Sequence, residues 1–305
     1  MFERVFKLSE HKTTVKTEVM AGITTFMTMA YILAVNPSVL GSTGMDTTAV
    51  LLATALASCL GTLCMAFMAN LPFALSAGMG LNAFMAYTVV AGYGYSWQVA
   101  LLAVFIEGLI FIVLSLTNVR EAIFNAIPLT LKKGVSVGIG LFIAFIGLQN
   151  SGLCVDSATL VGIISFPENF HTAGICALLT LIGLFFTAVF YTRKMKGAIL
   201  YGILLTWILG MLCQVTGLYV PTPDAGFYSL FPSWGMTDFS KLGLTFGQCF
   251  NVDFSNVGIV NFIIVVFSFL FVDIFDTLGT LIGVATKADM LDEEGRLPGI
   301  KPALM

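Results

Sequence analysis

Two acidic residues and two threonines recur at helical spacing within one apolar stretch. Asp273, Asp276, Thr277 and Thr280 stand at positions i, i+3, i+4 and i+7, which places two carboxylates and two hydroxyls along one side of a helix. No lysine or arginine stands among them. A carboxylate in apolar surroundings is costly unless it is paired, hydrated or protonated. The pattern therefore predicts either a wet site for a cation, a proton or a hydrogen-bonding solute, or polar contacts between helices.

A second polar feature combines a proline, two glycines and an amide. Pro72, Gly78 and Gly80 make the start of this run a poor helix, so we expect extended chain followed by a half-helix that begins near Gly78. Such a helix start carries free backbone N–H groups, and Asn82 adds a donor and an acceptor in its first turn. The alternative is an ordinary helix whose glycines allow close packing.

Three further candidates lie elsewhere in apolar runs. Thr25 and Phe26 belong to a run with three threonines and two aromatic residues, which suits a pocket for a flat ligand. Threonines in helices also bond to their own backbone, and the spacing does not separate the two readings. Glu107 is a lone acid, either a proton-carrying group or a protonated structural one. Asn36 and Pro37 predict a helix break near the end of the first run.

The composition is that of an integral membrane protein. Of 305 residues, 58% are hydrophobic and only 10% charged, and the mean hydropathy is +0.96. A soluble domain carries about 25% charged residues, so most of this surface faces lipid or other helices. There is no basic cluster for nucleic acid, and the six cysteines form no CxxC pair. No catalytic triad, metal-ligand cluster or nucleotide loop is visible, so we expect no enzyme activity, no metal and no cofactor.

Eight runs have about the length that a bilayer core requires. The third is the weakest, because it contains the proline and glycines described above. The all-α polytopic fold is thus predicted to have eight spans, at residues 19–40, 48–69, 73–91, 97–117, 134–149, 173–191, 198–217 and 258–285.

The cations support this count. If all eight runs cross, every lysine and arginine except Lys241 falls on one side of the membrane. Cytoplasmic loops carry the excess of these residues, so both ends of the chain are predicted to be cytoplasmic in a multi-pass protein of the cell membrane. Residues 1–18 then form a cytoplasmic interfacial segment, 118–133 a cytoplasmic connector, 218–257 an extracellular segment and 286–305 a cytoplasmic tail. The extracellular segment is expected to be a folded cap or partly re-entrant.

Three motifs in order resemble the nucleobase:cation symporter-2 (xanthine/uracil permease) family, in its AzgA-like branch of adenine/guanine/hypoxanthine permeases. The first is Gly22–Phe26 with Met29–Pro37, the second Ser76–Phe84 and the third Phe271–Thr280. The resemblance runs from about residue 2 to the end of the chain.

The family implies fourteen spans in two inverted repeats of seven. Residues 19–117 and 258–285 would be core-domain spans, and 134–217 gate-domain spans. Span three would combine a short strand with a half-helix. Carried over by position, Gly80 and Asn82 match the family's binding positions in span three, and Asp276 matches its span-eight carboxylate. Thr280 replaces the histidine of the uracil branch, which agrees with the purine branch.

Eight spans cover the first repeat and one helix of the second. The resemblance therefore implies that the chain is truncated and lacks the acidic residue that the family carries in span ten.

The leading hypothesis is proton-coupled uptake of a purine nucleobase by alternating access. Asp276, Asn82 and the backbone near Gly80 would hold the base, with Thr280 and Thr25 beside it. Phe26 or Phe84 would stack on it. Asp276, Asp273 and Glu107 are the proton-coupling candidates. The lipid bilayer and the base are the expected partners, with a homodimer as the family implies and no nucleic acid. The alternatives are a non-transporting fragment, an anion transporter of the same architecture, which the two carboxylates disfavour, and a membrane-embedded enzyme.

Overall fold

The computed structural model describes most of the chain. It covers residues 6–10, 12–117, 127–158, 160–195, 197–223, 226–232, 235, 237–255, 257–288 and 290. Most of the predicted connector 118–133 and of the predicted tail 286–305 therefore lies outside the described residues. The described end of the connector is helical, because the fifth predicted span begins earlier than its apolar run, at Leu129.

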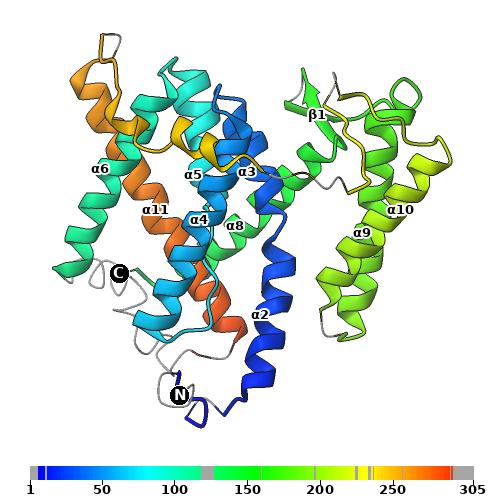
Figure 1. The fold of residues 1–305 in the computed structure, drawn as a ribbon, viewed down its shortest axis with the longest axis horizontal. Helices are drawn as coiled ribbons and strands as arrows, with labels where there is room; N and C mark the ends of the chain where they lie inside the picture. The colour runs from blue at the N-terminus through cyan, green and yellow to red at the C-terminus, as the bar shows by residue number, and fades with distance from the viewer. Residues whose placement is uncertain are drawn as a thin grey trace. The chain divides into compact units, whose positions relative to one another are not determined.

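The described chain is mostly helical, as the apolar runs predict (Figure 1). In chain order the helices are α2 (Val15–Met29), α3 (Ile32–Gly41), α4 (Thr47–Cys64), η1 (Met65–Ala69), α5 (Met79–Ala83), η2 (Phe84–Gly92), α6 (Trp97–Leu116), α8 (Leu129–Asn150), η3 (Phe170–Gly174), α9 (Ile175–Thr192), α10 (Ala198–Val215), η5 (Phe239–Leu244), η6 (Gln248–Phe250) and α11 (Ile259–Lys287). The first three η segments are π-helical, and η5 and η6 are 3₁₀ turns.

Within the described residues, seven helical stretches are long and apolar enough to cross a bilayer. They are Val15–Gly41, Thr47–Ala69, Trp97–Leu116, Lys133–Asn150, Phe170–Thr192, Ala198–Val215 and Ile259–Lys287. The remaining predicted run, 73–91, contains the shorter apolar helix Met79–Gly92. The chain is therefore polytopic, while the count of eight crossings and the inverted repeat stay predictions.

The first run is interrupted earlier than predicted. α2 ends at Met29 and α3 begins at Ile32, whereas Asn36 and Pro37 lie buried inside α3. The prediction of a break at Asn36–Pro37 was therefore wrong. The ring of Pro37 crowds the carbonyl of Leu33 and removes one backbone donor, and α3 accommodates both without ending there.

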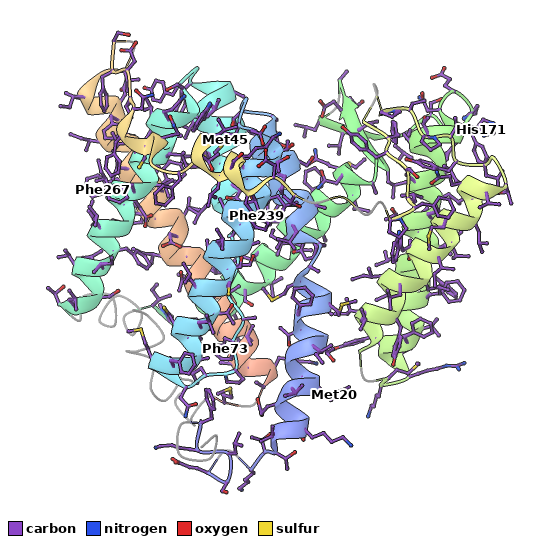
Figure 2. The ribbon with its side chains drawn as sticks, in the orientation of Figure 1. Met20, Met45, Phe73, His171, Phe239 and Phe267 are labelled. Atoms are coloured by element: carbon purple, nitrogen blue, oxygen red, sulfur yellow. The ribbon has the colours of Figure 1, made fainter. Side chains whose placement is uncertain are left out.

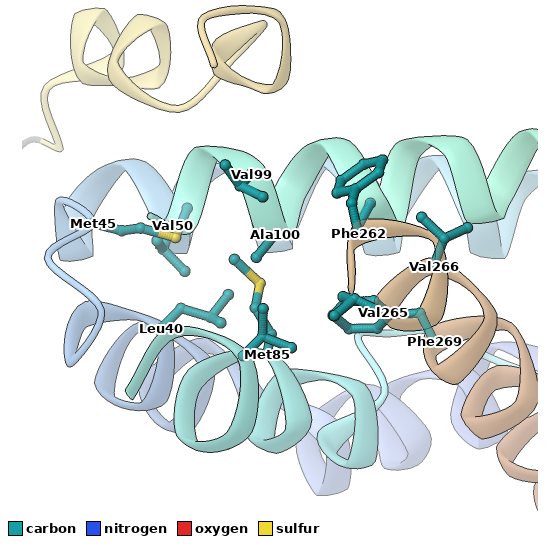
Figure 3. Close-up of a cluster of buried hydrophobic side chains, with 12 residues drawn as sticks. Leu40, Met45, Val50, Met85, Val99, Ala100, Phe262, Val265, Val266 and Phe269 are labelled. Carbon is teal, nitrogen blue, oxygen red and sulfur yellow. The ribbon is translucent and has the colours of Figure 1, made fainter. Parts of the chain in front are cut away.

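The chain divides into two compact units, which we treat separately. The first comprises residues 1–21, 29–140 and 237–305, and the second residues 22–28 and 141–236. In the first unit, side chains of α3, α4, η2, α6 and α11 meet in one apolar cluster (Figure 3). Phe269 of α11 is completely buried there. In lipid such clusters hold helices together by close packing rather than by exclusion of water.

Small residues let α11 approach the start of α8 closely. A Cβ on Gly283 would lie 2.6 Å from Oγ of Ser136. A Cβ on Gly279 would overlap the Ile139 side chain and lie 3.1 Å from Val135 Cγ1. Glycine spaced at i and i+4 is the common way for membrane helices to pack backbone to backbone.

The second unit is built on the hairpin of α9 and α10 (Figure 1). Two glycines and two threonines face each other across it. A Cβ on Gly183 would overlap Oγ1 of Thr206, and a Cβ on Gly202 would overlap Oγ1 of Thr187. Each threonine hydroxyl donates to a glycine carbonyl of its own helix, Thr187 to Gly183 at 2.7 Å and Thr206 to Gly202 at 2.8 Å. Neither glycine can carry a side chain without moving the opposite helix.

A short antiparallel hairpin, absent from the sequence-based expectations, also belongs to the second unit. β1 (Cys154–Ser157) pairs with β2 (Leu160–Ile163), with Cys154 opposite Ile163. Each strand has only four residues, which is too short for a recognisable alternating pattern.

The predicted extracellular segment 218–257 is folded, and it is shared between the units. Its first part lies on the α9–α10 hairpin, where Trp207 Nε1 donates to the carbonyl of Leu230 at 2.9 Å and Gln214 Oε1 accepts from the N–H of Leu230 at 2.8 Å. Its second part, with η5 and η6, lies on the first unit. There Lys241 pairs with Asp46 at 3.3 Å, close to Met45 and Phe239, which Figure 2 labels.

Candidate functional site

The third apolar run is a broken helix. η1 ends at Ala69, and Asn70 after it is left-handed with a φ of 52°. Residues 71–78 belong to no helix or strand, and Gly78 at their end is extended, with φ −73° and ψ 118°. α5 then begins at Met79 and continues as η2 to Gly92. The predicted half-helix from near Gly78 is confirmed. The short strand that the resemblance implied for this span does not form, because residues 71–78 have no neighbouring strand to pair with in the part of the chain that the structure describes.

Hydroxyl groups of α4 form hydrogen bonds with the segment 71–78. Thr62 Oγ1 accepts from the N–H of Leu75 at 3.0 Å and donates to its carbonyl at 3.2 Å. The hydroxyls of Ser58 and Ser76 lie 2.9 Å apart. Backbone groups inside a membrane need such partners, because no water replaces the missing helical bonds. Thr62 therefore satisfies the backbone of Leu75, and Ser58 holds the side chain of Ser76.

Asp276 on α11 lies against the start of the half-helix. A Cβ built on Gly78 would come within 2.7 Å of Oδ2 of Asp276. One turn earlier on α11, Val272 approaches Gly80, where a Cβ would lie 4.0 Å from Cγ1 of Val272. The two features predicted separately, the carboxylate of α11 and the half-helix, thus form one site.

The helix start supplies hydrogen-bond donors to this site. The N–H of Asn82 donates to the carbonyl of Gly78 at 3.1 Å and makes the first bond of the helix. The N–H groups of Met79, Gly80 and Leu81 precede that bond, so the helix provides no acceptor for them. A carboxylate acceptor and backbone donors lie side by side here.

The predicted polar stripe of α11 is only partly a site. Thr277 donates to the Asp273 carboxylate at 3.4 Å, and the Thr280 hydroxyl donates to the backbone carbonyl of Asp276. At about 100° per residue, Val272, Asp276, Gly279 and Gly283 share one face, whereas Asp273 and Thr277 turn away from it. Among the four stripe residues, Asp276 is the one that the structure brings to the half-helix.

Asn82 takes part in a buried hydrogen-bond chain. Its Nδ2 donates to Oδ1 of Asn36 at 2.5 Å, and Nδ2 of Asn36 donates to Oγ1 of Thr54 at 2.6 Å. Thr54 in turn donates to the carbonyl of Val50 at 2.7 Å. Asn36 is 3% exposed and Thr54 is 5% exposed. The amide predicted to contact a ligand is thus held by two polar residues that the site prediction did not include.

Comparison with known proteins identifies the family of this chain. The model of the permease family, that of the xanthine/uracil permeases, matches residues 16–303. The chain belongs to this permease family. It is 46% identical over 304 residues to a putative permease of Methanocaldococcus jannaschii, 41% over 308 residues to an adenine permease of Escherichia coli and 43% over 310 residues to a guanine/hypoxanthine permease of Bacillus subtilis.

These alignments take in 99%, 100% and 98% of the chain. The chain spans 65%, 63% and 66% of the lengths of these relatives. The resemblance read from the three motifs is confirmed at the level of the family, and the relatives are named as permeases rather than enzymes.

Of the remaining candidate residues, one is used in apolar packing, two belong to the second unit and one is buried on α6. Phe84 meets Phe269 edge to face at 4.9 Å and belongs to the apolar cluster, so its ring is used in packing. Phe26, 62% exposed, and Thr25 belong to the second unit. Glu107 is 5% exposed on α6, a helix that packs along α11.

Asn36 and Thr54 are the permease residues that sequence reasoning missed at this site. Both are polar residues within apolar runs, which is a signal that the sequence carries. Asn36 was read through its neighbour Pro37 as a helix break. The pairing of Asn36 with Asn82, 46 residues away, becomes visible only when α3 and α5 are seen side by side.

Proposed function

We propose that this permease takes up a purine nucleobase (hypoxanthine, guanine or adenine) in symport with a proton, by alternating access. The observation that carries the proposal is the placement of the Asp276 carboxylate against Gly78 at the start of the half-helix. The names of the relatives, an adenine permease and a guanine/hypoxanthine permease among them, support the substrate class.

The chemistry of the site suits the edge of a purine. Such an edge carries hydrogen-bond donors and acceptors next to one another. An ionised Asp276 accepts from ring or amino N–H groups. The N–H groups of Met79 and Gly80 donate to a carbonyl or ring nitrogen, helped by the positive end of the helix dipole. Acceptor and donors side by side match this pattern better than they match a simple anion.

Glycine at position 80 is better explained by a ligand that needs the space than by packing within the protein. A Cβ there would touch only Cγ1 of Val272, at 4.0 Å, so the protein itself does not need glycine. The open space lies beside backbone N–H groups, where a flat base can approach closely.

Asp276 is also the first candidate for proton coupling. A carboxyl group that touches the substrate changes its charge when it binds or releases a proton, and this links base binding to the proton. Asp273 and Glu107 are the alternative carriers on α11 and α6. Alternating access would then be the movement of the core-domain spans against the gate-domain spans.

Uptake of radiolabelled hypoxanthine, guanine and adenine by cells expressing the gene tests the proposal. We expect uptake of at least one base, its loss in Asp276→Asn by about tenfold or more, and its collapse when a protonophore removes the proton gradient. Gly108→Ala is a matched control, since no atom lies within 4 Å of a Cβ at this helical position. No uptake of any base would sink the proposal, and uptake that resists the protonophore would sink its proton-coupled part.

The distribution of lysine and arginine supports a multi-pass orientation in the cell membrane with residues 1–18 and 286–305 on the cytoplasmic side. The family resemblance adds a homodimer to the proposal, which the mass of the detergent-solubilised protein tests.

A further inference from the structure

The hydrogen-bond chain behind Asn82 has a fixed direction. Thr54 has a single hydroxyl proton, and it donates this proton to the carbonyl of Val50 at 2.7 Å. While Thr54 makes this bond, its oxygen accepts from Asn36. Asn36 must turn its NH₂ group to Thr54, as observed at 2.6 Å, and its carbonyl oxygen to Asn82.

The orientation of the Asn36 amide also sets the orientation of the Asn82 amide. Because Oδ1 of Asn36 can only accept, Asn82 must turn its NH₂ group to Asn36. This leaves Oδ1 of Asn82 as the atom outside the chain of bonds. A side-chain amide can normally rotate to offer either its oxygen or its nitrogen, and here the rotation is decided by α3 and α4.

We propose that Asn36 and Thr54 are positioning residues that make Asn82 present a hydrogen-bond acceptor to the substrate. The inference rests on the proposed function and deepens it. The substrate class is narrowed to bases that place an N–H donor opposite Asn82. Asn36 and Thr54 do not touch the substrate and act only through the Asn82 amide.

The burial of Asn36 and Thr54 supports their role in orienting the Asn82 amide. Asn36 and Thr54 are nearly inaccessible, and a flipped Asn36 would require the Thr54 hydroxyl to leave the Val50 carbonyl and the Asn82 amide to flip as well. A hydroxyl that only joined two helices could take either direction. The bond of Thr54 to Val50 favours the observed direction, in which the Thr54 oxygen accepts from Asn36.

The test measures discrimination between ligands rather than activity. Inhibition of labelled hypoxanthine uptake is measured for hypoxanthine and for its N1-, N7- and N9-methyl derivatives. In the unmodified protein, methylation of the N–H that faces Asn82 should weaken inhibition by about tenfold or more. Asn82→Ala identifies that position, because it removes the penalty.

Thr54→Val should reduce the same penalty to about threefold or less, since Asn36 and then Asn82 become free to flip. Thr54→Ser, which keeps the hydroxyl, should retain the full penalty. Thr180→Val is the matched control, because Thr180 also donates to its own helix, to the Cys176 carbonyl at 2.9 Å, but lies outside this chain of bonds. Uptake is normalised to the amount of protein in the membrane, and Thr54→Ala replaces Thr54→Val if the latter does not accumulate.

If Thr54→Val weakens inhibition by all four ligands equally and keeps the methylation penalty, the inference is overturned, and Thr54 has only a structural role. A penalty that survives in Asn82→Ala would overturn it as well. Absent uptake by the unmodified protein would instead overturn the proposed function and this inference together. The two failures are thus distinguishable.

Discussion

Oδ2 of Asp276 lies so close to Gly78 that a single methyl group at position 78 would come within 2.7 Å of it. The two residues are far apart in the sequence and belong to α11 and to the entry of α5. Their approach joins the carboxylate to the helix start, and it gives the permease its candidate substrate site.

Gly78→Ala is expected to displace the Asp276 carboxylate. Real Cβ atoms do not approach other atoms to 2.7 Å, so either the carboxylate or the half-helix must move. We expect uptake of the transported base to fall by about tenfold or more, because small misplacements of a binding group are costly. Uptake is measured at equal membrane abundance, with Gly108→Ala as the control. Unchanged uptake in Gly78→Ala would contradict the geometry of this site.

Gly80→Ala is expected to fold normally and still to impair transport. The added methyl group meets only Val272, at van der Waals distance, so the thermal stability in detergent should stay within about 0.5 kcal/mol of the unmodified protein. The methyl group occupies the space in front of the helix N–H groups, so the KM for the base should rise by about tenfold. A normal KM would show that the base does not approach position 80.

Gly183→Ala is expected to destabilise the α9–α10 hairpin. The methyl group would overlap Thr206, and overpacking of this kind costs about 1–3 kcal/mol. Thermal unfolding of the detergent-solubilised protein should therefore begin at a lower temperature. Thr206→Ala in the same chain removes the overlapping hydroxyl and should recover more than half of the loss.

Gly147→Ala serves as the control for the hairpin, since it adds the same methyl group to a helix where no atom lies within 4 Å. If Gly147→Ala and Gly183→Ala lower the unfolding temperature equally, the tight contact of the hairpin does not determine its stability.

Acid is expected to weaken the contact between η5 and α4. The pKa of Asp46 is held below its ordinary value of 3.8, first by the N–H of Ala49, which donates to its carboxylate at 2.9 Å, and also by Lys241. A carboxyl group whose pKa is lowered by folding stabilises the folded state above its unfolded pKa, and this contribution is lost as the pH falls below that value. The unfolding temperature should therefore decline between about pH 5 and pH 3.

Asp46→Asn tests this assignment. The amide can still accept from the Ala49 N–H but carries no charge, so the variant should be less stable at neutral pH and should lose less stability on acidification. An identical acid-induced decline in Asp46→Asn and the unmodified protein would rule out Asp46 as its source.

The sequence was sufficient for the helical membrane class and for the break in the third run. Both depend on local properties, the length of apolar runs and the conformational limits of Pro72, Gly78 and Gly80. The polar stripe of α11 was predicted correctly as a set of residues on a helix. One of these residues faces the half-helix, and others bond to α11 itself. Which residue does which depends on where α5 and α8 pack against α11.

The roles of individual side chains were less predictable. Phe84 stood in a motif that suggested stacking, and packing placed it against Phe269. Asn36 suggested a helix break, and packing made it the partner of Asn82. Each of these side chains can serve more than one purpose, and the sequence does not say which neighbour it will meet.

By itself, the sequence determined that this chain is a polytopic membrane protein with few polar residues in its spans and a broken third run. The cost of burying charge and backbone polar groups in lipid leaves little freedom in these properties. Only the tertiary structure decided that Asp276 meets Gly78 and that Thr54, Asn36 and Asn82 form one chain of hydrogen bonds. Contacts between distant segments depend on helix packing, and the direction of a hydrogen bond depends on which donor and which acceptor that packing brings together.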